Sequence, residues 1–242
     1  MYTIFVCLGN MPRLLELFSG TGSVGRPFQE AGWDVISVDI CPGFNPTLCE
    51  NVLDIPLDRW PEGHFDFIWS SPPCTHFSRL QNTAKNKNPE DLLVARRCVI
   101  HSLCLIRALR PRVWCVENPA TGTLKNESFW GNINLPHKWA DVSYCKYSDP
   151  TVPVQTFTYR KQTRIWYSGF EWFPKVCRCD CLAIGPKIVS FCYYMIVCVC
   201  VCKKREGEGR HREAERRERE GGEEEGRDGQ SEGGEWEGSG AQ

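Results

Sequence analysis

Short apolar segments that each stop at a glycine, an aspartate or a pair of prolines constrain the fold of this chain more than any other feature. Their length and their β-branched and aromatic content predict strands at residues 13–18, 33–40, 49–55, 65–70 and 113–116. Residues 24–31 and 89–109 show helical patterns, and Asn88 and Pro89 are typical of the start of a helix. Strands that alternate with helices predict an α/β fold with a mostly parallel sheet.

Polar and reactive residues lie where these predicted strands end. Ligands of parallel sheets bind at the carboxyl ends of the strands. We therefore expect one site there, formed by residues that follow or end five different strands, namely Gly20, Asp39, Asp54, Cys74 and Glu117.

The composition divides the chain into a body and a tail. From residue 203 onward the sequence is almost entirely Arg, Glu and Gly, with nine basic and thirteen acidic side chains. Such a segment buries too little apolar surface to offset the entropy of ordering, which predicts a disordered tail at residues 203–242. The body keeps a small excess of basic side chains, which permits nucleic-acid binding without requiring it.

Residues 177–202 form a Cys-rich apolar segment between body and tail. Its charge-free part, residues 188–202, is shorter than the roughly 20 residues that cross a bilayer, so a membrane span is disfavoured. Alternating Val-Cys and Arg-Glu are what GT and AG dinucleotide repeats encode, and we interpret the sequence after about residue 181 as translated simple-sequence DNA. The expected organisation is an extension at 1–12, a folded domain at 13–176, this segment and the tail.

Fifteen cysteines raise the question of disulfides or metal. Their odd number and the lack of a leading signal peptide favour reduced thiols and an intracellular protein. The C-x-C-x-C spacing of Cys177, Cys179 and Cys181 differs from the C-x-x-C pairs of structural zinc sites, so no metal is expected.

The glycine loop suggests a nucleotide-like ligand. Gly20 and Gly22 let the backbone turn tightly and approach a ligand, although an ordinary strand–helix turn has the same pattern. Asp39, at the end of the second strand, can accept hydrogen bonds from both hydroxyls of a ribose. Asp54 can contact the exocyclic amine of an adenine, and an exposed surface carboxylate is the alternative for both aspartates.

Cys74 differs from the other cysteines in its surroundings. Two prolines stiffen the chain before it and polar residues follow, which indicates a loop rather than a core. An exposed cysteine can act as a nucleophile when a partner favours its thiolate, and a structural thiol is the alternative. His76 would be the base of a Cys-His hydrolase, but no orienting Asn or Asp is evident for it. Glu117 could donate a hydrogen bond as a carboxylic acid, or be an ordinary strand-end glutamate.

Taken together, the segments LLELFSGTGSVGRPFQEAGWDVISVDI, DFIWSSPPC and VWCVENP resemble the cytosine-5 DNA methyltransferase family. The resemblance covers residues 13–175 and rests on the order of a Phe-Gly loop, a Pro-Cys motif and a Glu-Asn motif. It implies a Rossmann-like methyltransferase fold, S-adenosylmethionine as cofactor, cytosine in DNA as substrate, and a nuclear location in a eukaryote. Some relatives with these motifs act on tRNA, so RNA is an alternative substrate.

The same resemblance implies a role for individual residues. Cys74 corresponds to the nucleophile, Glu117 to the glutamate at N3 of the base, and Arg164, within RKQTRIWYSG on a strand, to the contact on the O2 side. The implied cofactor-binding residues are Phe18, Gly20, Gly22, Asp39, Asp54 and Pro73.

The sequence also departs from the family pattern. Thr75 stands where Gln is usual, Pro119 where Val is common, and Gln162 at the first arginine position. No target-recognition region or closing motif is recognisable after Arg164, which predicts a core without these parts. An inactive homologue that binds S-adenosylmethionine or nucleic acid is therefore the second hypothesis. A nicotinamide oxidoreductase is a more distant hypothesis, because the Pro-Cys and Glu-Asn motifs would have no function in such an enzyme.

Overall fold

A computed structural model of the chain describes residues 11–77, 88–143, 157–158, 162–172 and 183–184. The chain divides into two units, Met1–Val199 and Cys200–Gln242, and every described residue belongs to the first unit. Residues 1–10, the cysteine trio at 177–181, the apolar run at 188–202 and the tail at 203–242 lie outside the described residues, so the expectations for them stay predictions.

The described elements alternate along the chain much as the sequence pattern indicates. The strands are β1 (Arg13–Leu17), β2 (Asp34–Asp39), β3 (Leu48–Cys49), β4 (Phe67–Ser70), β5 (Val113–Pro119), β6 (Lys138–Ser143), β7 (Phe157–Thr158), β8 (Gln162–Ser168) and β9 (Ala183–Ile184). The α-helices are α1 (Gly25–Glu30), α3 (Pro89–Leu109) and α4 (Phe129–Asn132). Short 3₁₀ helices lie at η1 (Pro42–Phe44), η2 (Val52–Asp54), η3 (Thr75–Phe77) and η4 (Leu124–Asn126).

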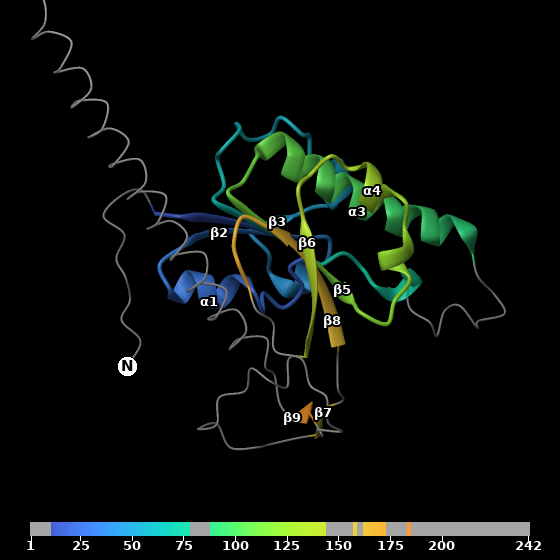
Figure 1. The fold of residues 1–242 in the computed structure, drawn as a ribbon. Coiled ribbons are helices and arrows are strands. Elements are labelled where there is room, and N and C mark those ends of the chain that lie inside the picture. Colours follow the sequence, from blue (N-terminus) through green and yellow to red (C-terminus); the bar gives the residue numbers. More distant parts are fainter. Residues whose placement is uncertain (1–10, 78–87, 144–156, 159–161, 173–182, 185–242) are drawn as a thin grey trace, which may run out of the picture. The chain divides into compact units, whose positions relative to one another are not determined.

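Seven strands form one sheet in the order β3-β2-β1-β4-β5-β8-β6 (Figure 1). The strands from β3 to β5 pair in parallel, whereas β8 runs antiparallel to both of its neighbours, β5 and β6. The expected α/β fold with a mostly parallel sheet is therefore confirmed. β7 and β9 form a separate two-stranded pair.

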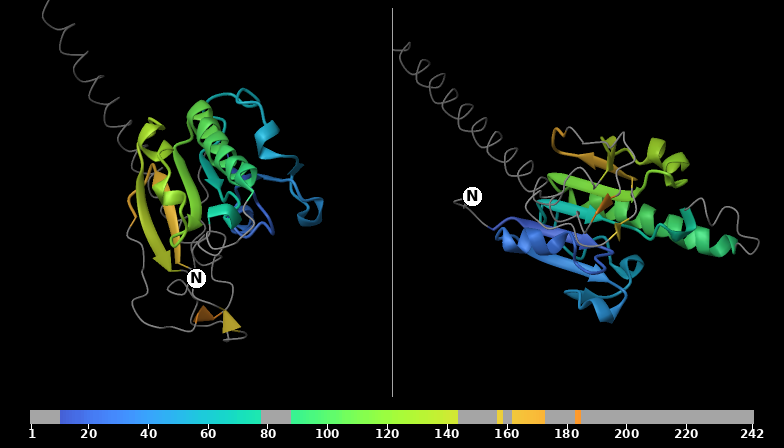
Figure 2. Two further views of the ribbon diagram at one scale, coloured as in Figure 1. Left: turned by 90° about the vertical axis from the view of Figure 1, so that its right-hand side faces the viewer. Right: turned by 90° about the horizontal axis from the view of Figure 1, so that it is seen from below.

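Helices α1 and α3 cover opposite faces of the sheet. The ring of Phe28 in α1 lies 5.4 Å from that of Phe67 in β4, whereas Ser102 in α3 accepts a hydrogen bond from the Ser70 hydroxyl of the same strand. Phe67 and Ser70 are three residues apart, and successive strand side chains alternate between faces, so they point to opposite sides. Figure 2 shows α3 running alongside the sheet.

The core under α3 is large and apolar, and it fixes the sheet against this helix. It includes Leu15, Leu17, Ile68, Val99, Leu103, Ile106, Trp114, Val116 and Trp166. The rings of Trp130 and Trp166 stack at 4.3 Å between centroids, nearly parallel, which joins the segment after β5 to β8.

The expectation of a strand over residues 49–55 is wrong. Only Leu48–Cys49 pairs with β2, and the chain then turns into η2. The side chain of Asn51 accepts a hydrogen bond from the Leu53 amide at 3.1 Å, which starts the turn. Val52 and Ile55 are both buried, and their spacing of three is the 3₁₀ repeat rather than strand alternation.

Strands β6 and β8 complete one edge of the sheet. β8 confirms the strand expected around Arg164, whereas the sequence pattern gave no prediction for β6. In β6 the first two residues, Lys138 and Trp139, are both exposed, and the last two, Val142 and Ser143, are both buried. A strand signal based on alternation is weak in such a segment.

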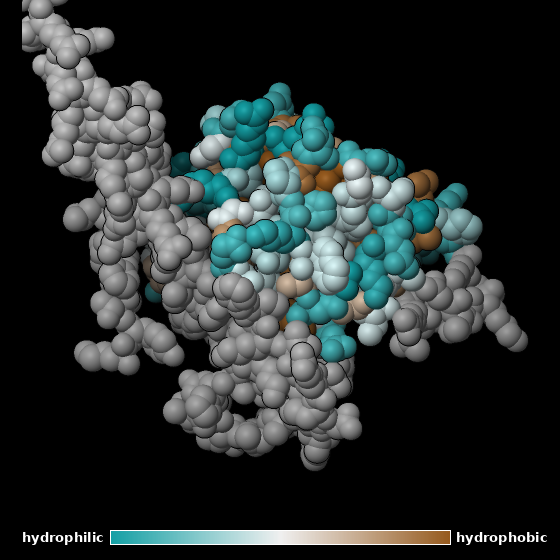
Figure 3. Space-filling model, viewed as in Figure 1, coloured by the Kyte–Doolittle hydropathy of each residue, from teal (hydrophilic) through white to brown (hydrophobic). Residues whose placement is uncertain are grey.

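The visible surface of the described residues is mostly hydrophilic, with hydrophobic side chains in small separate patches (Figure 3). Among the helices in the part of the chain that the structure describes, none is long and apolar enough to span a membrane. The six cysteines described as free include the exposed Cys41 and Cys49 and the half-buried Cys74 and Cys104.

Candidate active site

The register of the sheet brings three of the predicted site residues, Phe18, Asp39 and Glu117, into one row. Val38, Leu17, Ser70 and Val116 are neighbours across four parallel strands. The next residue along each strand is Asp39, Phe18, Ser71 and Glu117, respectively. The carboxyl ends of β2, β1, β4 and β5 therefore meet at one edge, where ligands of parallel sheets bind.

The loop after β1 turns sharply at this edge. Phe18, Gly20 and Gly22 all have positive φ values, between 51° and 67°, so the chain leaves the strand through left-handed conformations. These conformations cost little only for glycine, which explains the two glycines of the loop. A side chain at Gly20 would have no atom within 4 Å, so the space beside its Cα is open.

Asp39 joins this loop to the end of β2. Its carboxylate accepts a hydrogen bond from the Gly20 amide at 2.8 Å and another from the Cys41 amide at 2.9 Å. The side chain is only half-buried, so its remaining lone pairs stay available at the edge of the sheet. The contact with Gly20 shows that Asp39 shapes the glycine loop.

Glu16 lies beneath the same loop, and the sequence analysis did not single it out. It is 2% exposed and accepts a hydrogen bond from the Gly25 amide at 3.1 Å. Burial raises the pKa of Glu16 to about 7, although the amides of Gly25 and Val24 oppose this shift. A Cβ on Gly25 would lie 2.5 Å from the Glu16 carboxylate, so only glycine permits this approach. The signal in the sequence is one charged residue within the apolar run LLELF.

Cys74 lies just beyond the end of β4 and begins the short turn η3. The Phe77 amide donates a hydrogen bond to the Cys74 carbonyl oxygen at 3.1 Å, which closes the turn. The thiol is half-buried, so the structure confirms a loop position rather than a core position. Pro73 before it is exposed and Pro72 is buried.

Glu117 and Asn118 lie at the end of β5, beside this turn. Glu117 is 7% exposed, so it is a buried side chain at the strand end. Asn118 is fully buried, and its side-chain amide donates a hydrogen bond to the Pro72 carbonyl oxygen at 3.1 Å. The Glu-Asn motif therefore contacts the Pro-Cys loop directly.

Arg164 lies in β8, where its register partner in β5 is Asn118. Its guanidinium makes two hydrogen bonds to the Asp141 carboxylate of β6, at 2.7 and 3.0 Å, and lies 3.8 Å from the ring centre of Trp139. Such a bidentate contact fixes the direction of an arginine side chain. The structure thus brings Arg164 to the Glu-Asn end of β5 and holds it there from the edge strand.

Asp54 stands apart from this row. It is exposed and lies in η2, five residues after the end of β3. The His101 ring of α3 lies 3.0 Å from the Ile55 carbonyl oxygen, which ties this turn to the helix. Asp54 therefore lies on a turn rather than at a strand end, outside the row formed by the other strands.

These residues fit S-adenosylmethionine. The half-buried carboxylate of Asp39 can accept hydroxyl groups, and the glycine loop leaves open space beside Gly20. The hydroxyl of Ser19 is buried without a hydrogen-bond partner among the described residues, as expected of a loop shaped for a polar ligand. Within the same residues, no three His, Cys, Asp or Glu side chains are grouped as a metal site.

The sequence is similar to two curated proteins. It is 35% identical over 175 residues to the probable DNA (cytosine-5)-methyltransferase of frog virus 3 (isolate Goorha), a match that covers 68% of this chain and 74% of the viral protein. It is 26% identical over 121 residues to the type II methyltransferase M.XorII of Xanthomonas oryzae pv. oryzae (strain KACC10331 / KXO85), covering 43% of this chain and 27% of that protein. No protein-family model matches the sequence.

Three solved structures are also similar. They are a putative prophage DNA modification methyltransferase from E. coli (TM-score 0.45, 19% identity), Entamoeba histolytica EhMeth (0.46, 14%) and S. pombe Dnmt2 (0.45, 14%). The matches cover 64%, 70% and 68% of this chain, and 46%, 56% and 52% of those proteins, respectively, so the chain spans about half their length.

The match to the viral protein, at 35% identity, covers 74% of that protein's length. The chain therefore belongs to the DNA (cytosine-5)-methyltransferase family.

Proposed function

We propose that this chain transfers a methyl group from S-adenosylmethionine to C5 of cytosine in DNA through a covalent bond between Cys74 and C6 of the base. The observation that carries the proposal is the meeting of the Pro-Cys turn and the Glu-Asn strand end at the edge of the sheet, where Asn118 bonds to Pro72. Family membership supports the reaction class.

The chemistry explains why a thiol and a carboxyl group belong together. C5 of cytosine is too weak a nucleophile to take a methyl group unaided. Addition of the Cys74 thiolate to C6 forms a sulfur–carbon bond and moves the electron pair of the C5–C6 double bond toward C5. Glu117, as a carboxylic acid, would donate its proton to N3 and neutralise the charge that the ring acquires.

After the methyl transfer the remaining steps restore both groups. A base removes the proton from C5. The electron pair of the broken C5–H bond re-forms the C5–C6 double bond, and the C6–S bond breaks so that Cys74 leaves as a thiolate. The N3 proton returns to Glu117. Because the thiol must approach C6 from above or below the plane of the ring, where neighbouring bases stack in a duplex, the cytosine must be unpaired or flipped out of the duplex.

The cofactor, when bound, supplies a sulfonium methyl group as the electrophile. We infer that Asp39 would hold its ribose hydroxyls, that Phe18, Gly20 and Gly22 would form the loop around it, and that Asp54 would contact its adenine. Pro73, as part of the Pro-Cys turn, would also contact the cofactor. Arg164, oriented by Asp141, would bind the O2 side of the base.

Methyl transfer from labelled S-adenosylmethionine tests the proposal. We expect the full chain to label double-stranded DNA more than tRNA, and Cys74→Ala to abolish labelling. Cys104→Ala is the matched control, because Cys104 is also a half-buried free thiol but lies in α3. Labelling of tRNA and not of DNA would show that the substrate is RNA. Cofactor binding by calorimetry without labelling of any cytosine polymer would identify an inactive homologue.

A further inference from the structure

We propose that Thr123, in the segment after β5, positions the Cys74 turn for attack through two hydrogen bonds to the Phe77 carbonyl oxygen. The inference deepens the proposed function and rests on the role of Cys74 as the nucleophile. Thr123 acts on the turn and not on the substrate, so it is a positioning residue.

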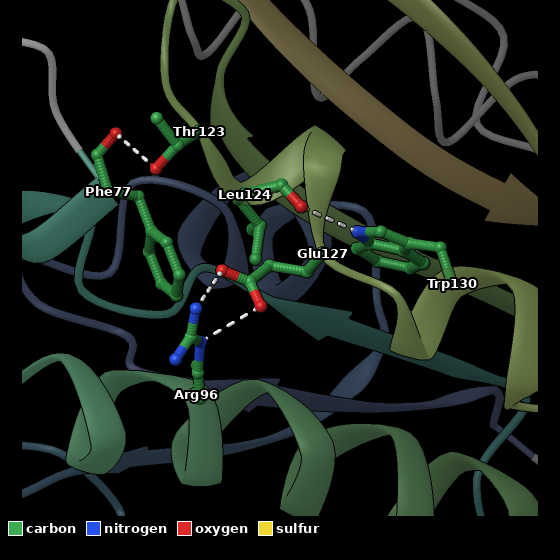
Figure 4. A network of polar contacts seen from close by, with 6 residues as sticks. All are labelled: Phe77, Arg96, Thr123, Leu124, Glu127 and Trp130. Carbon is green, nitrogen blue, oxygen red and sulfur yellow. Dashed lines mark hydrogen bonds and ion pairs between the residues drawn. The ribbon is translucent and has the colours of Figure 1, made fainter.

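The contact is made at the residue that closes the turn. The Phe77 amide bonds to the Cys74 carbonyl oxygen at 3.1 Å, and the Phe77 carbonyl oxygen accepts the Thr123 amide at 2.8 Å and the Thr123 hydroxyl at 3.2 Å. Figure 4 shows the threonine hydroxyl directed at this oxygen. The ring of Phe77 is fully buried, so packing and hydrogen bonds hold the same residue.

Thr123 is itself fixed by its own segment. The Gly122 amide bonds to the Pro119 carbonyl oxygen at 2.9 Å. A Cβ on Gly122 would lie 3.1 Å from the carbonyl oxygens of both Phe77 and Pro119, so glycine permits the close approach of the two backbones. The end of β5 therefore fixes the position of the Thr123 amide and hydroxyl relative to Phe77.

A second anchor connects this segment to α3. Arg96 makes two hydrogen bonds to the Glu127 carboxylate, at 2.9 and 3.0 Å, and the Trp130 indole donates to the Leu124 carbonyl oxygen at 2.9 Å (Figure 4). Bidentate contacts between arginine and a carboxylate restrict both side chains. The segment is thus held from the strand and from the helix, which makes it a rigid support for the turn.

The turn is then held on both sides of the thiol. Asn118 bonds to Pro72, two residues before Cys74, and Thr123 bonds to Phe77, three residues after it. Misplacement of a reacting group by about 1 Å can cost about 100-fold in rate. Because Thr123→Val keeps the backbone bond and the shape of the side chain, we expect a smaller loss, of about tenfold.

The test compares Thr123→Val with Thr123→Ser in the full chain. The probe is a DNA duplex with cytosine fluorinated at C5, together with S-adenosylmethionine, and the rate of covalent adduct formation is measured. We expect Thr123→Val to form the adduct about tenfold more slowly, to exchange the Phe77 amide hydrogen faster, and to bind the cofactor as tightly as the unmodified chain. Thr123→Ser, which keeps the hydroxyl, should restore both the rate and the protection.

Thr47→Val is the matched control, because Thr47 is an exposed threonine whose hydroxyl bonds to Ser37 near β3. It should behave as the unmodified chain. Equal adduct rates and equal Phe77 exchange in Thr123→Val would overturn the inference, as would a Thr123→Ser chain as slow as Thr123→Val. If the unmodified chain forms no adduct, the proposed function fails; Phe77 exchange then decides whether Thr123 holds the turn.

Discussion

Glu16 carries a carboxyl group into the interior of the molecule, directly below the glycine loop. Its hydrogen bond to the Gly25 amide ties β1 to the start of α1, so its protonation state affects the part of the fold that forms the expected cofactor site. Periodicity did not reveal it, because a single acidic residue does not disturb the apolar pattern of LLELF. Asp39 could be predicted, since it ends a strand, but its bond to Gly20 could not.

The stability of the folded chain should depend on pH through Glu16. The pKa of Glu16 rises from its ordinary value of 4.5 to about 7, so between these values the folded chain keeps a proton that the unfolded chain releases. The free energy of unfolding should fall as the pH rises from about 4.5 to about 7 and level off above, with an upper limit on the order of 3 kcal/mol. Urea denaturation of the full chain at a series of pH values measures this.

Glu16→Gln keeps the shape and the acceptor but cannot titrate. It should therefore flatten that part of the stability profile, with the largest gain relative to the unmodified chain above pH 7. A profile as steep in Glu16→Gln as in the unmodified chain would show that other groups cause the dependence.

At the scale of elements, local chemistry decides which segments the sequence can predict. Helix α3 has the predicted bounds of residues 89–109, because Asn88 accepts from the Glu90 amide and Pro89 suits the first turn. The sequence predicts a strand where η2 lies, because the short segment CENVLDI resembles one and the Asn51 contact that starts the turn is visible only in the structure. β6 was missed because its burial does not alternate.

The Asn88 cap should stabilise the start of α3. Asn88→Ala removes the acceptor of the Glu90 amide and should lower the free energy of unfolding by about 1 kcal/mol. Asn88→Asp keeps an acceptor and should cost little, because a negative charge is also favoured at the start of a helix. Urea denaturation with an unchanged slope would show the change as a stability effect. Equal midpoints for Asn88→Ala and the unmodified chain would mean that the cap does not contribute.

At the scale of the whole sheet, the register explains why distant motifs form one site. Asp39, Phe18, Ser71 and Glu117 follow one row across four strands, so a sequence that predicts parallel strands also predicts their convergence. The sequence could not show the supporting contacts, such as those of Thr123 with Phe77 or Asp141 with Arg164, because these depend on which loops and edge strands become neighbours.

If Cys74 is the nucleophile, it must carry the covalent bond to the base, and identification of the modified residue tests this. The full chain is incubated with S-adenosylmethionine and a DNA duplex containing cytosine fluorinated at C5, digested, and analysed by mass spectrometry. We predict a covalently attached base on Cys74, lost in Cys74→Ala and kept in Cys104→Ala. An adduct on another cysteine, or undiminished methyl transfer by Cys74→Ala, would contradict the account.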